Sequence, residues 1–208
     1  AAGGEAAAVA EVMRPLLSVL ADLHEVGLVH RDLKPDNMIY AEGDAVFKLI
    51  DFGASALCLG TAINHEPGDG PHDPKYCGLG ETNLLPEEAF IFDGLNKMSY
   101  ELSEEELQSV WERFEPQLFD VYSAGIILMQ LAVPALHSGE GLDAFREELA
   151  ACDFDLDAWR ERHMGAAPYA EHGAPALDAD GGKYWQAARA MLRPRGERAS
   201  VAEALAFF

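Results

Sequence analysis

The residues of this sequence that could do chemistry are concentrated in one stretch, 30–37, which reads His-Arg-Asp-Leu-Lys-Pro-Asp-Asn. The carboxylate of Asp32 could accept a proton from a hydroxyl group, and the ammonium of Lys34 could hold a phosphate. Asn37 and, further along, Asp51 carry the oxygen ligands that Mg²⁺ prefers, which it shares with phosphate oxygens. The pattern is therefore typical of a site that handles a phosphate group with the help of magnesium.

A short β-hairpin is predicted between these two magnesium ligands. Its strands are the extended stretches Met38–Tyr40 and Val46–Ile50, with a polar turn between them. Such a hairpin would bring Asn37 and Asp51 to the same end, where both could face one cation. Gly53 follows closely and lets the chain turn sharply beside the metal ligand.

The elements that must position this loop are predicted to be mainly helical. A small-residue leader over 1–8 precedes a helix over 9–27, whose apolar residues fall at helical spacing. The most apolar segment is Leu118–Val133, which predicts a buried helix. Further helices are predicted over 142–150, 156–163, 183–192 and 201–208. No strand of consequence is expected after residue 50.

Composition narrows the partners that the chain could have. The chain has 208 residues, of which 49% are hydrophobic and 25% charged, as in an ordinary globular domain. Its 15 Lys and Arg against 36 Asp and Glu give a net charge of −21. Such an acidic surface repels nucleic acids and anionic membranes and favours basic partners. The sequence also contains no apolar run long enough to cross a bilayer.

The cysteines indicate a reducing compartment. Cys58, Cys77 and Cys152 are odd in number and form no Cys-x-x-Cys pair. A disulfide framework or a cysteine zinc site is therefore not expected.

The loop over 30–37, followed after a hairpin by Asp51-Phe52-Gly53, resembles the catalytic loop and metal-binding triplet of protein kinases. Pro86-Glu87 resembles the end of a kinase activation segment, and Asp120 resembles the aspartate that braces the catalytic loop from the central helix of the large lobe. Arg198 resembles the arginine that pairs with that glutamate, Glu87. Lys34 follows the pattern of serine/threonine kinases.

The resemblance implies a role for each of these residues. Asp32 would take the proton of the substrate hydroxyl, and Lys34 would stabilise the transferring phosphate. ATP and Mg²⁺ are the implied cofactors, with Asn37 and Asp51 as metal ligands. The implied structural supports are His30, Arg31, Phe52, Gly53, Glu87, Asp120 and Arg198.

The resemblance also implies an architecture. The chain would be the mainly α large lobe of a kinase, with one small β-hairpin and without the small β lobe that clamps ATP. Its expected parts are the leader and first helix, the catalytic loop, hairpin and metal-binding triplet over 28–53, the activation segment over 51–87, an insert over 88–117 and a helical subdomain over 118–208. This chain alone is expected to transfer phosphate slowly or not at all, because the missing small lobe would be its necessary partner.

Arg31 precedes the catalytic aspartate, an arrangement that in many kinases receives a phosphorylated residue of the activation segment. The candidate acceptors are Ser55, Thr61, Tyr76 and Thr82. An activation segment without any phosphorylation is an equally good interpretation.

The long insert between Glu87 and Asp120, together with the segments 152–160 and 177–182, is similar to the chloroplast state-transition kinases of plants and green algae. Members of that family phosphorylate light-harvesting antenna proteins from the stromal side of the thylakoid membrane. The basic N-terminal tails of such substrates would suit the acidic surface. The alternative is a pseudokinase or docking module that kept the kinase fold but lost phosphate transfer.

Overall fold

A computed structural model describes the chain over residues 2–44, 46–57, 73–77, 103, 105 and 115–208. Helix α1, Ala2–Glu25, begins earlier than the sequence predicted. The prediction of a separate leader over 1–8 was wrong. The described residues of this stretch form the first turns of α1, because Ala6 and Val9 are buried and extend the apolar face of the helix. Gly27 follows the helix with a φ of 75°, a conformation that favours glycine at a helix end.

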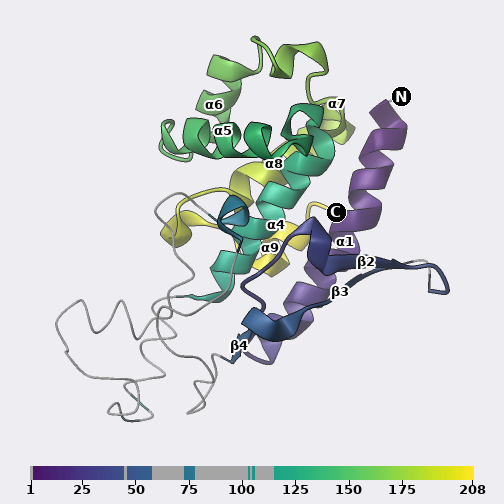
Figure 1. Cartoon of the computed structure of the whole chain (residues 1–208), viewed down its shortest axis with the longest axis vertical. Coiled ribbons are helices and arrows are strands. Elements are labelled where there is room, and N and C mark those ends of the chain that lie inside the picture. The colour runs from purple at the N-terminus through teal and green to yellow at the C-terminus, as the bar shows by residue number, and fades with distance from the viewer. Residues whose placement is uncertain (1, 45, 58–72, 78–102, 104, 106–114) are drawn as a thin grey trace.

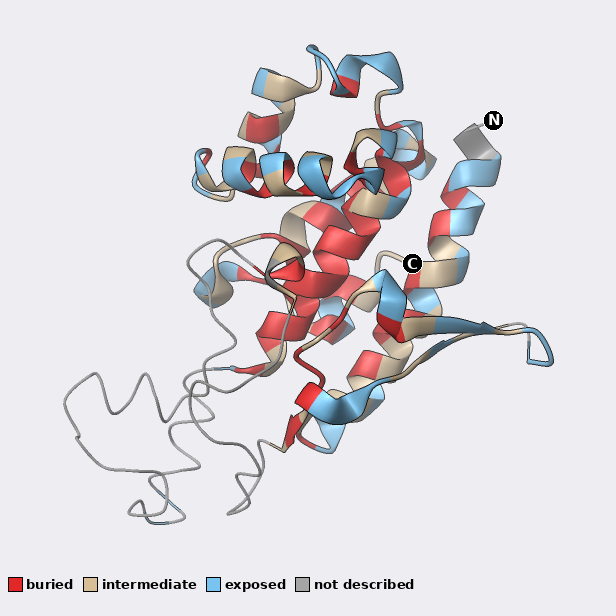
Figure 2. Ribbon diagram, viewed as in Figure 1, coloured by how far each residue is buried: buried red, intermediate tan, exposed pale blue. Residues whose placement is uncertain are grey.

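Helix α4, Gln117–Ala132, forms the centre of the core and confirms the buried helix that the sequence predicted. Figure 2 shows it as an almost continuously buried rod through the middle of the molecule. Helices α1 and α8, Lys183–Met191, both pack against it. The close approach of α8 requires Gly125, because a Cβ atom at that position would lie 2.9 Å from Cδ2 of Leu192.

Two antiparallel strand pairs frame the catalytic loop. Strands β2, Met38–Ala41, and β3, Val46–Leu49, form the predicted hairpin, which projects from the side of the helical body (Figure 1). Strand β1, Leu28–Val29, pairs with β4, Ala56–Leu57. No strand of consequence was expected after residue 50, and the one described there, β4, has only two residues. It ties the chain before the loop to the chain after the metal-binding triplet.

Four further α-helices complete the described part of the chain. They are α5, Gly139–Ala150; α6, Leu156–His163; α7, Pro175–Asp178; and α9, Val201–Leu205. The sequence predicted α5, α6, α8 and α9 to within a few residues at each end, although α9 ends before the predicted Phe208. The short helix α7 was not predicted. None of the helices in the described part of the chain is long and apolar enough to span a membrane.

A cluster of aromatic side chains joins α5 to α6. The ring of Trp159 meets the rings of Phe145 and Tyr169 edge to face, with centroids 4.8 and 5.1 Å apart. The carboxylate of Glu148 accepts hydrogen bonds from the indole of Trp159 at 2.9 Å and from the hydroxyl of Tyr169 at 2.8 Å. These contacts fix α5, the helix that reaches the activation segment.

Most of the predicted activation segment lies outside the described residues, which include only 51–57 and 73–77 of it. The predicted insert over 88–117 also lies mainly outside them. The sequence also predicts a helix that opens at Ser103, and nearly all of that stretch lies outside the described residues.

Candidate active site

The catalytic loop gathers its polar side chains around the carboxylate of Asp32. It runs from β1 to a 3-10 turn, η1, at Pro35–Asn37. Lys34 Nζ lies 3.1 and 2.9 Å from the two carboxylate oxygens of Asp32. The side-chain amide of Asn37 donates to Asp32 twice, to its Oδ2 at 3.0 Å and to its main-chain carbonyl at 2.7 Å. The loop therefore brings together three of the residues that the sequence singled out.

A third donor comes from the activation segment. The main-chain N–H of Asp73 donates to Oδ1 of Asp32 at 3.0 Å. Burial alone would raise the pKa of Asp32, but the hydrogen bonds and charge of Lys34, the amide of Asn37 and this N–H outweigh burial and leave the pKa below its usual value. The same pairing raises the pKa of Lys34. At neutral pH the pair is a carboxylate and an ammonium.

His30 links Asp32 to the end of the hairpin that leads to Asp51. Its Nε2 lies 3.1 Å from the carbonyl of Ile50, which only accepts, so Nε2 carries the proton. Its Nδ1 then accepts the main-chain N–H of Asp32 at 3.3 Å. The ring of Phe52 packs edge to face on the imidazole, with centroids 5.0 Å apart. The buried, neutral imidazole of His30 thus connects the loop at Asp32 to the end of the hairpin at Ile50.

Asp120 on α4 braces the loop from behind. Its Oδ2 accepts the N–H of His30 and its Oδ1 accepts the N–H of Arg31, both at 2.8 Å. Arg31 has a φ of 69°, which costs a non-glycine residue on the order of 1–3 kcal/mol. The fully buried carboxylate holds the strained backbone in place, which gives Asp120 the supporting position that the resemblance implied.

Sequence reasoning missed a second contact to this brace. His24, at the end of α1, places its Nε2 3.0 Å from Oδ2 of Asp120. Its side chain is also almost fully buried. A histidine near a helix end gave no signal of this role, because the contact spans 96 positions of sequence and exists only once α1 packs on α4.

Asn37 and Asp51 lie at the same end of the hairpin, since the carbonyl of Asn37 accepts the N–H of Ile50 at 2.9 Å. The amide nitrogen of Asn37 is used on Asp32, which leaves its side-chain oxygen for a cation. Asp51 is exposed, and its Oδ1 receives only a long hydrogen bond of 3.3 Å from the N–H of Gly53. Two hard oxygen donors on neighbouring backbone fit Mg²⁺ that completes its shell with phosphate and water.

Backbone contacts hold the triplet against the catalytic loop. Asp51 itself adopts a left-handed conformation, with a φ of 60°. A 3-10 turn, η2, follows over Phe52–Ala54. The guanidinium of Arg31 donates through Nε to the carbonyl of Ala54, and the hydroxyl of Ser55 lies 3.4 Å from the carbonyl of His30.

Arg198 packs against the first turns of α4. It donates to the carbonyl of Leu118 at 2.7 Å and to that of Arg193 at 2.9 Å, and its guanidinium covers the ring of Tyr122. Its predicted partner, Glu87, lies outside the described residues, as do the candidate phosphosites Thr61 and Thr82. The predicted pairing of Arg198 with Glu87 stays a prediction.

The other two candidate phosphosites differ in accessibility. Ser55 is partly exposed. Tyr76 is buried, and its hydroxyl donates to Oε1 of Gln130 at 2.9 Å. Burial raises the pKa of this phenol. Phosphorylation of Tyr76 would require this buried contact to open, which argues for a structural role instead.

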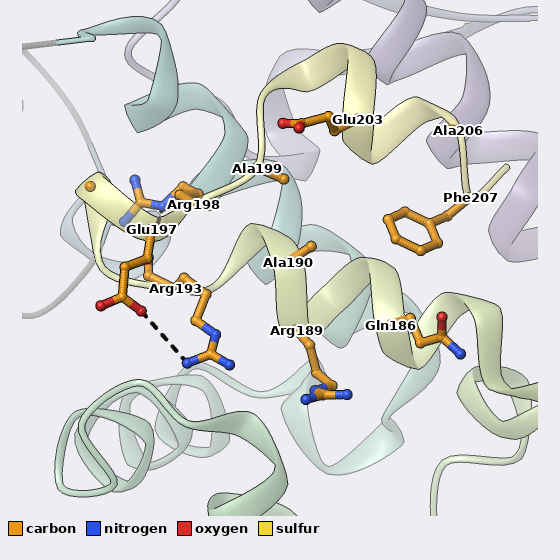
Figure 3. Close-up of a pocket in the computed structure, with 11 residues that line it drawn as sticks. Gln186, Arg189, Ala190, Arg193, Glu197, Arg198, Ala199, Glu203, Ala206 and Phe207 are labelled. Atoms are coloured by element: carbon orange, nitrogen blue, oxygen red, sulfur yellow. Dashed lines mark hydrogen bonds and ion pairs between the residues drawn. The ribbon is translucent and has the colours of Figure 1, made fainter.

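A cavity of about 720 Å³ lies on another part of the lobe, between α8 and α9 (Figure 3). Two arginines on its rim already pair with carboxylates: Arg193 with Glu197 at 3.8 Å and Arg189 with Asp157 at 2.8 Å. None of the loop residues around Asp32 lines it. The candidate chemistry therefore belongs to the loop and not to this cavity.

The arrangement of loop, triplet and bracing helix is that of the large lobe of a protein kinase. Over residues 4–67 the chain matches the family model described as protein kinase domain. By this match and by the site that it contains, the chain resembles the protein kinases, and among them the serine/threonine kinases that its sequence predicted.

Within this family the chain is similar to two chloroplast kinases of Arabidopsis thaliana. It is 36% identical over 198 residues to serine/threonine-protein kinase STN7, chloroplastic, and 37% identical over 200 residues to serine/threonine-protein kinase STN8, chloroplastic. Both matches cover 94% of this chain but only 34% and 38% of those proteins. The chain thus spans about a third of the length of the curated relatives it matches.

A solved structure gives the same result for the fold. The crystal structure of a Stt7 homologue from Micromonas algae, soaked with ATP, superposes with a TM-score of 0.84 at 40% sequence identity. The match covers 98% of this chain and 57% of that one. These findings confirm the predicted kinase fold and the predicted similarity to chloroplast kinases of a plant and to a kinase of green algae.

Proposed function

We propose that this chain is the catalytic large lobe of a serine/threonine protein kinase that transfers the γ-phosphate of ATP. The observation that carries the proposal is the carboxylate of Asp32, held by Lys34, Asn37 and the N–H of Asp73. Because the chain spans about a third of its curated relatives, the activity belongs to a polypeptide in which a nucleotide-binding small lobe accompanies it.

The contacts of Asp32 suggest how a substrate hydroxyl gains access to it. A carboxylate offers about four acceptor positions. Lys34 occupies one position on each of the two oxygens of Asp32. A phosphate that attracts Lys34 would free acceptor positions on Asp32. The substrate hydroxyl then donates to Asp32, which orients it and takes its proton as the oxygen attacks phosphorus. The lowered pKa keeps Asp32 ionised for this step.

Asn37 and Asp51 are the residues that would hold Mg²⁺. When bound, the cation neutralises charge on the transferring phosphoryl group. The chain's own contribution is to orient these donors: Asn37 is fixed through its amide nitrogen, and Asp51 through the hairpin and the Phe52–His30 contact.

We further propose a chloroplast location and antenna proteins as substrates. The chloroplast location is supported by the similarity to STN7 and STN8, which are both chloroplastic kinases. The stromal side of the thylakoid membrane and light-harvesting antenna proteins as substrates rest on the resemblance to state-transition kinases. The net charge of −21 favours a basic tail around the acceptor hydroxyl.

The test is transfer of labelled phosphate from ATP, with Mg²⁺, to a light-harvesting antenna protein. The whole kinase polypeptide that contains this chain and its small lobe would be compared with its Asp32→Asn variant. We expect labelling of threonine or serine that disappears in the variant. A folded protein that binds Mg-ATP but labels neither the antenna protein nor a generic basic peptide would contradict the proposal and favour the docking module.

An Asp51→Asn variant tests the metal ligand separately. We expect weaker binding of Mg-ATP, because one anionic oxygen ligand is lost. Unchanged affinity at every Mg²⁺ concentration would remove Asp51 from the proposed ligand set.

A further inference from the structure

Five residues of the activation segment, the 73–77 segment, connect the catalytic aspartate to helix α5. At one end the N–H of Asp73 donates to Oδ1 of Asp32 at 3.0 Å. At the other end the carbonyl of Cys77 accepts two hydrogen bonds from Arg146, from Nε at 3.0 Å and from Nη2 at 2.9 Å. A residue on α5 is thus connected to the proposed catalytic base through a short stretch of main chain.

The middle of the 73–77 segment is attached to α4. The hydroxyl of Ser123 donates to the carbonyl of Tyr76 at 2.8 Å, and the phenol of Tyr76 donates to Gln130 at 2.9 Å. These two hydrogen bonds fix the distance between the 73–77 segment and α4. The carbonyl of the last residue of the segment, Cys77, points toward Arg146, which donates to it twice.

The environment of Arg146 suits this directional role. The residue is buried, with 9% of its surface exposed, and its Nη1 lies 3.7 Å from the carboxylate of Asp143. The ammonium of Lys75 lies 3.4 Å from that same carboxylate, so α5 also holds the segment from outside. A planar guanidinium that donates two bonds to one carbonyl restricts its orientation, which the single point charge of a lysine does not.

Packing alone does not explain a buried arginine here. Moving a guanidinium out of water is costly, and an apolar side chain of similar volume would often serve the core as well or better. What the guanidinium adds is a fixed position for the Cys77 carbonyl.

We propose that Arg146 is a positioning residue for the protein substrate and acts through the main chain of the 73–77 segment. The segment lies beside the carboxylate that must meet the acceptor hydroxyl, so its orientation sets how the substrate chain lies across Asp32. Arg146 contacts neither Asn37 nor Asp51 through any of the bonds described above, so its role is separate from nucleotide binding. The inference rests on the proposed kinase activity.

The test is a separation of kinetic constants in the whole kinase polypeptide, with a basic threonine peptide as substrate. For Arg146→Met we expect the KM for the peptide to rise on the order of tenfold, since a small displacement of a positioning element has effects of this size or larger. The KM for ATP stays unchanged. Arg146→Lys keeps the charge but not the pair of hydrogen bonds to one carbonyl. Its KM for the peptide should therefore lie between those of the wild type and Arg146→Met.

Arg160→Met is the matched control. Arg160 on α6 also pairs with a carboxylate, that of Asp178 at 2.7 Å, and also covers an aromatic ring, that of Trp185. Its loss removes a charge and packing without touching the 73–77 segment, and we expect both KM values to stay at wild-type level. If Arg146→Met fails to fold, Arg146→Lys carries the comparison by itself.

The outcomes separate this inference from the proposed function. An active wild type with an unchanged peptide KM in the Arg146 variants overturns the inference alone. A rise of the ATP and peptide KM values by the same factor also overturns it, because that is a general loss of structure. A wild type that phosphorylates nothing overturns the proposed function and, with it, the inference.

Discussion

The catalytic loop and helix α4 lie against each other and are stabilised in opposite ways. The loop depends on individual polar contacts, in which Asp32, Lys34 and Asn37 each have a named partner. Helix α4 depends on apolar burial spread over nearly its whole length, where each fully buried aliphatic side chain contributes about 1.5–3 kcal/mol. Changes in the loop should therefore alter activity at nearly constant stability, and changes in α4 should alter stability first.

Asp120 belongs to both regions. It is a fully buried carboxylate in an apolar helix, yet all its described hydrogen bonds go to the loop side or to α1. The core holds a charged group because that group fixes the strained backbone at Arg31. One residue thus links the two regions. Four substitutions test whether the loop controls activity and α4 controls stability.

The largest expected effect comes from Asp32→Asn. The amide keeps the shape of the side chain but cannot take a proton, so turnover by the whole kinase polypeptide should fall about 10²–10⁴-fold. The melting temperature should fall only slightly, because the amide keeps the size of the side chain and what is lost is one ion pair, with Lys34, whose side chains both keep some contact with solvent. Asp36→Asn, at an exposed position of the same loop, is the control and should retain activity. Near-wild-type turnover in Asp32→Asn would remove the proposed base.

Asp120→Ala should cost stability as well as activity. The substitution leaves the N–H groups of His30 and Arg31 and the ring of His24 without their acceptor, at a cost of about 3 kcal/mol. Urea unfolding of the chain measures this loss. Asp178→Ala removes an exposed ion pair and should cost at most about 1 kcal/mol. Equal losses in the two variants would contradict the bracing role.

Gly125→Val tests the apolar region alone. A Cβ atom there would lie 3.0 Å from Cβ of Met191 and closer still to Leu192, so α8 must move. Overpacking of this kind costs about 2 kcal/mol, measurable by urea unfolding. Gly165→Val, where nothing lies within 4 Å of the added atom, is the control and should be nearly neutral. A neutral Gly125→Val would show that the helix contact is looser than described.

The smallest effect concerns the titration of Asp32. In the folded chain its pKa is lowered, so its contribution to stability is present above the unfolded pKa and is lost as pH falls through the folded pKa. Lys34→Met removes a hydrogen bond and a charge and should move that loss to higher pH. A carboxyl-carbon NMR titration measures the pKa directly. Lys48→Met, which removes the partner of Asp44 on the hairpin, should leave it unchanged.

Much of the site could be predicted from local sequence because its parts are close in the chain. The loop places Asp32, Lys34 and Asn37 within six consecutive residues. The hairpin that returns the chain to Asp51 is indicated by two short extended stretches with a polar turn between them. The positions of these residues follow from short-range geometry. The expected order of the helices also followed from their 3.6-residue spacing, with errors mainly at their ends.

The contacts that sequence reasoning missed all join distant segments. The hydrogen bond from Asp73 to Asp32, the contact of His24 with Asp120 and the anchoring of Cys77 by Arg146 depend on how α1, α4 and α5 pack. No spacing rule predicts such pairs. The leader predicted over 1–8 failed for a related reason, because tertiary burial of Ala6 and Val9 extends α1.

The sequence by itself determined which chemistry this chain could support and which family it resembles. A base, a cation for phosphate and two oxygen ligands are encoded by residue types at short spacing. Only the tertiary structure decided how that chemistry is held: which buried carboxylate supports the strained backbone, which tautomer of His30 joins the two halves, and which segment lies over Asp32. The reason is physical, because hydrogen bonds between distant residues form only after apolar burial has fixed the helices that carry them.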